Sequence, residues 1–254
     1  MQITLAHLYP DLMNIYGDQG NIQALKFRCQ QRQIKLIIKP IRLNDPLPPG
    51  SFDLLFGGGG QDQQQQLIAP DLYQKKSVLI KAAQTGIPML TICGTYQLFG
   101  AYFKPFSGPK MKGIGIFDAY TVASKQRKIG NILIKLNCKL KIENCKLLTG
   151  FENHSGNTFL KSGTKPLGKV LLGFGNNGQD KTEGAVTNNV FGCYLHGSLL
   201  PKNPHFCDYL IQLALENKYG PIKLEALNDQ LEWQAHSSAI SRTRKLRHPL
   251  LKYL

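Results

Sequence analysis

The junction at residues 88–97 constrains the fold of this chain more than any other stretch of its sequence. It reads Pro-Met-Leu-Thr-Ile-Cys-Gly-Thr-Tyr-Gln, a short apolar strand that runs directly into the start of a helix. A cysteine at such a sharp turn stands at the edge of a sheet, where the first N–H groups of the helix favour its thiolate. Cys93 is therefore a candidate nucleophile, and a small core residue is the alternative interpretation.

A second predicted strand brings a histidine to the same edge of the sheet. Residues 190–195 are apolar and are followed by His196 and Gly197. The carboxyl ends of the strands are where open α/β sheets bind their ligands. Because a thiol and an imidazole at two strand ends form a nucleophile and a base, His196 is the candidate base for Cys93.

Four consecutive glycines at 57–60 follow a short apolar segment at 53–56. Such a cluster forms either a tight turn or a loop whose N–H groups approach a ligand closely. It is neither a Walker loop nor a GxGxxG fingerprint that opens a helix. Beside a thiol nucleophile, we expect N–H groups of Gly58 or Gly59, together with that of Gly94, to form an oxyanion hole.

Predicted strands and helices alternate along the first hundred residues. Strands are expected at 3–8, 35–41, 53–56 and 88–92, with one helix from Asn21, its cap, to residue 32 and another over 70–85. This order predicts a three-layer α/β fold with a mostly parallel central sheet. The second half is richer in strands, which we expect at 113–117, 131–136, 147–152, 170–174, 184–186 and 190–195, before a helix at 203–218.

The character of the 254-residue chain changes after Pro221. We expect one domain over residues 1–220 and a basic C-terminal tail or partner-binding appendage over 221–254, compatible with a helix at 224–233. The formal net charge of +15 favours an anionic partner, namely nucleic acid, an acidic membrane surface or an acidic substrate, and a solvated basic surface is the alternative.

The sequence also predicts a compartment. No apolar run approaches the roughly 20 residues of a membrane span, and the N-terminus does not resemble a signal peptide. The six cysteines have no disulfide-framework spacing, and no zinc-binding pattern accompanies them. We therefore expect a cytoplasmic protein.

These motifs resemble those of class I (triad-type) glutamine amidotransferases. Cys-Gly-Thr-Tyr-Gln at 93–97 is similar to the Cys-Gly-Gly-Tyr-Gln of the cobyric-acid-synthase-like branch, and residues 150–156 are similar to that branch's Gly-x-Glu-x-His-x-Gly signature. Within the branch, residues 3–218 resemble the glutaminase subunits of lipid II isoglutaminyl synthase. The resemblance implies the three-layer class I glutamine amidotransferase fold.

The resemblance also implies roles for single residues. The nucleophile falls on Cys93, the base on His196, and the residue that holds glutamine on Arg127, whose guanidinium can bind an α-carboxylate bidentately. No metal or organic cofactor is implied. Thr95 replaces the family's usual glycine, and Ser198 stands where the triad has glutamate, so a Cys–His dyad is expected and the residue that orients His196 is left open.

Other features of the resemblance concern structure. We expect Glu152 and His154 to play structural roles near the site, and His7, His205, His236 and His248 to be ordinary histidines. Residues 136–147, which carry Cys138 and Cys145, look like an insertion.

The implied activity is glutamine hydrolysis through a thioester at Cys93. The ammonia would pass to a Mur-ligase-like partner subunit (MurT), which amidates the D-glutamate of lipid II to D-isoglutamine in peptidoglycan synthesis. The protein would then work at the inner face of the membrane through this partner and lipid II, with no nucleic acid expected. Two alternatives are an amidotransferase subunit of a corrinoid-type synthetase and a basic nucleic-acid-binding module without catalysis.

Overall fold

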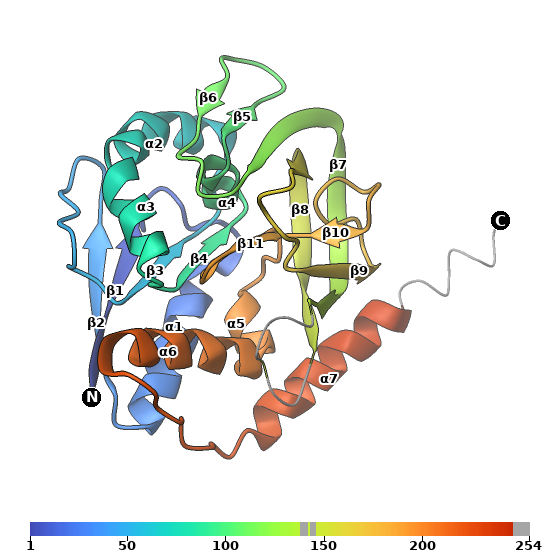
Figure 1. Cartoon of the computed structure of the whole chain (residues 1–254). Coiled ribbons are helices and arrows are strands. Elements are labelled where there is room, and N and C mark those ends of the chain that lie inside the picture. Colours follow the sequence, from blue (N-terminus) through green and yellow to red (C-terminus); the bar gives the residue numbers. More distant parts are fainter. Residues whose placement is uncertain (138–141, 143–145, 246–254) are drawn as a thin grey trace.

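The computed structural model describes residues 1–137, 142 and 146–245 (Figure 1). A six-stranded sheet has the order β11–β12–β4–β3–β1–β2, and all neighbours in it are parallel except β11 and β12. The predicted mostly parallel central sheet is therefore confirmed. Its strands are β1 (Gln2–Leu8), β2 (Lys35–Ile41), β3 (Leu54–Gly57), β4 (Met89–Ile92), β11 (Ala185–Thr187) and β12 (Val190–Cys193).

Helices cover both faces of this sheet. The chain passes from β1 to β2 in one direction and from β3 to β4 in the other, so right-handed crossovers place their helices on opposite faces. Thus α1 (Gln19–Gln31) lies on one side, and α2 (Asp62–Gln74) and α3 (Lys76–Gln84) lie on the other (Figure 1). Every residue of β3 and β4 is buried, as a doubly covered sheet requires. The later helices are α4 (Gly94–Phe99), α5 (Leu199–Lys202) and α6 (Pro204–Tyr219), which packs beside α1.

A second, largely antiparallel sheet lies beside the first (Figure 1). It is built around two long strands, β7 (Ala119–Leu136) and β8 (Leu147–Leu160), and a register shift between Ala123 and Lys128 makes β7 bulge. Two of the short strands expected from the sequence are parts of these long ones. The other strands of the sheet are β5 (Tyr102–Lys104), β6 (Met111–Lys112), β9 (Gly168–Leu172) and β10 (Thr182–Glu183).

Three local predictions are wrong. The helix expected over 70–85 begins at Asp62 instead, because the glutamine run has good helix propensity and Asp62 favours the first turn; Pro70 lies inside α2. Asn21 does not cap α1 but lies buried within it, where its Oδ1 accepts the Leu200 N–H at 2.8 Å. Residues 113–117 form no strand; their N–H groups bond instead to carbonyls of residues 98–101.

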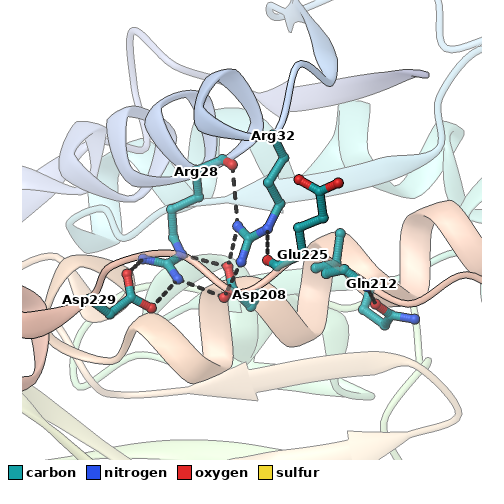
Figure 2. Close-up of polar contacts among 7 residues, drawn as sticks. Arg28, Arg32, Asp208, Gln212, Glu225 and Asp229 are labelled. Atoms are coloured by element: carbon teal, nitrogen blue, oxygen red, sulfur yellow. Dashed lines mark hydrogen bonds and ion pairs between the residues drawn. The ribbon is translucent and has the colours of Figure 1, made fainter.

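The segment after residue 220 packs on the domain through a network of ion pairs (Figure 2). Arg28 of α1 donates to Asp208 of α6 at 2.6 Å and to Asp229 at 2.7 Å, and Arg32 also bonds to Asp208. The helix α7 (Gln230–Lys245) begins after this network, later than the expected 224–233, and contacts α5, β7 and β8.

Buried histidines hold α7 in place. His205 stacks on Trp233 with ring centroids 5.3 Å apart, and Nδ1 of His236 lies 2.7 Å from the Lys202 carbonyl oxygen. Cys138, Cys145 and His248 lie outside the described residues. Within the described ranges, no helix has the length and apolar character needed to span a membrane.

Candidate active site

The predicted nucleophile lies at a strained turn between β4 and α4. Cys93 has φ +47° and ψ −103°, a backbone conformation that residues other than glycine rarely adopt. The turn is held because the Cys93 N–H donates to the Cys193 carbonyl at 2.8 Å and the Cys93 carbonyl accepts the Gln97 N–H at 2.9 Å. Strain of this kind persists where surrounding contacts impose it, and it concentrates at functional sites.

Thr95 ties the elbow to the glycine loop. It is fully buried, and its hydroxyl donates to the Gly58 carbonyl at 2.6 Å. A Cβ on Gly57 would lie 2.5 Å from the Thr95 methyl group. The β-branched residue that departs from the family pattern is therefore accommodated, because a glycine opposite it leaves room and its hydroxyl is bonded.

Gly59 lies between the predicted nucleophile and the predicted base. A Cβ built on Gly59 would be 2.7 Å from Cε1 of His196 and 3.3 Å from Cβ of Cys93. The distance between Cε1 of His196 and Cβ of Cys93 therefore cannot exceed the sum of these two distances. The structure brings the two residues together, and any side chain on Gly59 would collide with the imidazole.

His196 is completely buried and lies three residues beyond the end of β12 at Cys193. Its N–H donates to the Phe151 carbonyl at 2.7 Å and its carbonyl accepts the Phe151 N–H at 3.2 Å, so β8 fixes its backbone. Burial, and then the nearby His154, lower the pKa of His196 to about 3, which keeps the imidazole neutral and able to accept a proton. Ser198 does not orient it, because the Ser198 hydroxyl donates to the Gly17 carbonyl at 2.5 Å.

The thiol is also neutral at rest. Burial raises the pKa of Cys93 well above its ordinary value, and the Asp18 carboxylate raises it further. The Gly94 N–H and the Arg127 guanidinium act in the opposite direction by favouring the thiolate. A neutral thiol beside a neutral imidazole can attack a carbonyl if its proton passes to the imidazole.

Asp18 is a buried acid at this site to which the sequence analysis assigned no role. It is fully buried, and its Oδ2 accepts the Gly59 N–H at 2.6 Å, while its Oδ1 has no hydrogen-bond partner within the described part of the chain. Burial raises the pKa of Asp18 to about 7. Because the Asp18 carboxylate already accepts the Gly59 N–H, that group could serve an oxyanion only after this bond is released. The predicted donor of Gly94 already interacts with the Cys93 thiol.

Arg127 and Cys93 line one cavity. The bulge of β7 carries Arg127, whose Nε donates to Oδ1 of Asn153 on β8 at 2.6 Å. The cavity has a volume of about 430 Å³, in the range of small-molecule sites. His196 is not among its lining residues but lies behind the glycine loop. Besides Arg127, the polar residues that line this cavity are Gln61, Asp62, Gln63, Gln65, Gln97, Asn153, His154 and Ser155.

Glu152 and His154 have structural contacts. Both carboxylate oxygens of Glu152 accept backbone N–H groups, from Phe174 at 2.7 Å and Gly175 at 2.9 Å. The ring of His154 stacks on Tyr194 with centroids 3.6 Å apart, and its Nδ1 lies 2.9 Å from the Gly156 carbonyl oxygen. His154 thus lines the cavity, while Glu152 holds the backbone at Phe174 and Gly175.

Known proteins resemble this chain in fold and in sequence. Structural similarity extends to a glutamine amidotransferase from Thermotoga maritima (TM-score 0.51, 15% identity, 98% of this chain and 94% of that one) and to the glutaminase domain of Trypanosoma brucei CTPS (TM-score 0.51, 12% identity, 88% and 98%). At these identities the likeness supports the class I glutamine amidotransferase fold alone.

Sequence relatives are closer. The GatD subunit of lipid II isoglutaminyl synthase from Staphylococcus aureus is 37% identical over 96% of this chain and 97% of its own length. The Streptococcus pneumoniae GatD subunit is 40% identical over 91% and 87%. A probable cobyric acid synthase from Methanothermobacter thermautotrophicus is 30% identical over 84% of this chain but only 45% of its own length.

The CobB/CobQ-like glutamine amidotransferase domain matches residues 4–204, which include the elbow, the glycine loop and His196. This match covers most of the chain. The chain belongs to the CobB/CobQ-like glutamine amidotransferases and is similar over nearly its whole length to the GatD subunits of lipid II isoglutaminyl synthase.

Proposed function

We propose that this protein is the glutaminase subunit that supplies ammonia to a Mur-ligase-like synthetase subunit (MurT), which amidates the D-glutamate of lipid II to D-isoglutamine. The observation that carries the proposal is the cavity that Cys93 and Arg127 share, with a neutral imidazole next to the thiol. The names of the similar GatD subunits support the choice of synthetase and substrate.

In the proposed mechanism, Sγ of Cys93 attacks the side-chain carboxamide carbon of glutamine while the thiol proton passes to His196. The Gly94 N–H and the glycine loop stabilise the oxyanion. The C–N bond then breaks, and His196 returns the proton to the departing nitrogen, which leaves as ammonia and leaves a glutamyl thioester behind. Water that gives a proton to His196 hydrolyses the thioester, and the products are glutamate and the free thiol.

Arg127 gives the site its preference for free glutamine. Its guanidinium is a cationic group in the cavity wall, and it can bind the free α-carboxylate of glutamine. Asp62 lies in the same cavity and can accept hydrogen bonds from the α-ammonium group of glutamine. Burial raises the pKa of Asp62, and Arg127 acts in the opposite direction.

The test separates glutamine use from synthetase activity. In the complex with the synthetase subunit, Cys93→Ala and Arg127→Ala should abolish glutamine-dependent amidation of lipid II and keep amidation with added ammonium salt. Lys125→Ala, in the same bulge and exposed, is the matched control and should behave as wild type. Glutamine-dependent amidation by Cys93→Ala at the wild-type rate would overturn the mechanism.

The substrate assignment has its own test. With lipid II as acceptor, the complex should form D-isoglutamine, and a corrinoid carboxylate offered instead should stay unmodified. Lipid II is a membrane-bound pyrophosphate, so we also propose that the complex works at the inner membrane face, where a net charge of +15 favours anionic headgroups.

A further inference from the structure

Three aromatic side chains form a row across the second sheet. Tyr102 of β5, Tyr120 of β7 and Phe159 of β8 lie side by side, with ring centroids 5.3 Å apart in both neighbouring pairs. The strand register produces this row, because Phe103 pairs with Thr121 and Tyr120 pairs with Phe159. All three rings of the row are half-buried, so part of each reaches the surface of the protein.

Four exposed lysines surround the row. They are Lys104, Lys110, Lys112 and Lys161. The ammonium group of Lys110 lies 4.6 Å from the Tyr102 ring centroid, and that of Lys161 lies 5.9 Å from the Tyr120 ring centroid, which are cation–π distances. Lys112 pairs with Tyr102 across β6 and β5 and therefore shares its face. The fourth lysine, two residues along β5 from Tyr102, shares that face as well.

The charges of these four lysines are not neutralised by carboxylates of the described residues. The sequence has one acidic residue between residues 72 and 142, Asp118, and its Oδ2 accepts the Gly163 N–H at 3.2 Å. Within the described ranges, the lysines that form ion pairs with carboxylates are Lys75 and Lys218, and neither belongs to this group. An anion that approaches the aromatic row therefore finds four lysine charges available to it.

The loop between β5 and β6 adds an exposed apolar side chain beside the lysines. This loop projects from the body of the molecule (Figure 1), and its Phe106 side chain is 60% exposed. Pro105 and Pro109 restrict the backbone of the loop. The Nζ of Lys104 also donates to the Gly108 carbonyl at 3.1 Å, which ties the two sides of the loop together. A restrained aromatic ring among lysines is typical of segments that enter the interfacial region of a membrane.

We propose that these lysines, the aromatic row and Phe106 form a surface that binds the anionic headgroups of a lipid bilayer. The lysines attract the phosphate groups, and Phe106 enters the interfacial region beside them. The inference rests on the proposed function for its choice of a bilayer, since the acceptor lipid II is anchored there. It deepens that function, because this chain itself then contacts the membrane, in addition to its synthetase subunit.

This lysine–aromatic surface faces away from the cavity of Cys93. Successive side chains of a strand point to opposite faces of its sheet. Phe103, which lies between Tyr102 and Lys104 on β5, lines the cavity of the nucleophile. Its two neighbours therefore point to the other side of β5. The chain can thus lie on a bilayer without closing the cavity in which glutamine is hydrolysed.

The arrangement of the rings favours a headgroup surface over single-stranded nucleic acid. Proteins bind single strands by stacking bases on open faces of aromatic rings. Here Tyr120 lies between Tyr102 and Phe159, with interplanar angles of 21° and 29°, so its neighbours occupy its faces. At Tyr120 the surface therefore offers a ring edge rather than a ring face to a partner.

The experiment compares two variants that lose the same charge at different places. The surface variant changes three lysines of the lysine–aromatic surface: Lys110→Gln, Lys112→Gln and Lys161→Gln. The control variant changes three exposed lysines of α1 and β2: Lys26→Gln, Lys35→Gln and Lys39→Gln. Co-sedimentation of the full chain with vesicles measures the Kd for lipid. One set of vesicles is phosphatidylcholine alone, and the other is equal parts of phosphatidylcholine and phosphatidylglycerol.

Wild type should bind the anionic vesicles and not those of phosphatidylcholine alone. A lysine next to an anionic bilayer changes the Kd about fivefold, so the surface variant should bind about a hundredfold more weakly than wild type. The control variant should stay within about threefold of wild type, because charges farther from the bilayer than the Debye length are screened. Phe106→Ser should weaken binding about tenfold. Phe27→Ser, at a residue of α1 that is 48% exposed, should not.

Equal losses in the surface and control variants would overturn the proposal, because net charge alone would then explain the binding. No binding of wild type to the anionic vesicles, or binding of single-stranded RNA in their place, would also overturn it. In the complex with the synthetase subunit, the surface variant should amidate lipid II in anionic vesicles more slowly than wild type, and lipid II in neutral detergent at the wild-type rate. Failure of the proposed function would instead show as no glutamine-dependent amidation of lipid II in detergent by wild type.

Discussion

Removal of Arg28 should destabilise the protein strongly, although the residue lies far from Cys93 in the sequence. Its side chain is 3% exposed and binds two carboxylates, Asp208 at 23% exposure and Asp229 at 15% (Figure 2). The network joins α1, α6 and the segment that leads into α7. In Arg28→Met, Asp208 keeps Arg32, but Asp229 becomes a largely buried charge without a cationic partner among the described residues.

The size of the effect follows from burial. Breaking a buried ion pair by removing one partner costs about 3–5 kcal/mol. Because both carboxylates retain some contact with water, we expect the lower end, about 3 kcal/mol, in the free energy of unfolding. For a chain of this size that corresponds to a fall in Tm of about 6–12 °C.

Urea denaturation and calorimetry measure this loss, and the chain provides a matched control. Arg42 forms the same kind of bond with Asp11 at 3.0 Å, but the two side chains are 57% and 65% exposed. Arg42→Met should therefore cost no more than about 1 kcal/mol. Limited proteolysis should also cut residues 221–245 faster in Arg28→Met than in wild type. Equal stability of the two variants would refute the reasoning that burial sets the strength of the network.

Two further predictions concern the site. Burial raises the pKa of Asp18 from 3.8 to about 7. Between about pH 4 and 7 the carboxyl is ionised in the unfolded state but still protonated in the folded state, so the free energy of unfolding falls as the pH rises through this range. Asp18→Asn should therefore be more stable than wild type at pH 8 by on the order of 4 kcal/mol, a gain that vanishes near pH 4 in urea titrations; a gain independent of pH would contradict this cause. Gly59→Ala places a methyl group 2.7 Å from Cε1 of His196, and glutamate release should fall to background; a variant with near wild-type glutaminase activity would show that the glycine is dispensable.

Local patterns predicted much of the first sheet. Short apolar runs between glycines and prolines predicted β1, β3 and β4 nearly to the residue, since strands buried on both faces have a composition that is easily recognised. The strands of the second sheet were predicted as fragments. The reason is that β7 and β8 carry charged and polar residues along their length and are held together by antiparallel pairing rather than by an apolar run.

The C-terminal segment shows why a change in composition is a weak guide to packing. Its composition predicts a basic tail or partner-binding appendage, yet the described part of it, residues 221–245, packs on the domain. Leu224 bonds to Gln212 of α6, Asp229 to Arg28 of α1 and His236 to the Lys202 carbonyl of α5, and α7 also contacts β7 and β8. These contacts depend on single buried groups within an otherwise exposed segment. No periodicity in the sequence marks them.

The sequence by itself determined the strand–cysteine–helix elbow, the histidine at a neighbouring strand end and the family, because these depend on short motifs and on the order of the elements along the chain. Only the tertiary structure decided that Gly59 separates His196 from Cys93, that Asp18 binds that glycine, and that the bulge in β7 carries Arg127 to the thiol's cavity. Each of these is a contact between layers, and a register shift of one residue in a strand would turn such a side chain to the opposite face. The Cys93 elbow was therefore predictable, whereas the surroundings that set the protonation of its thiol were not.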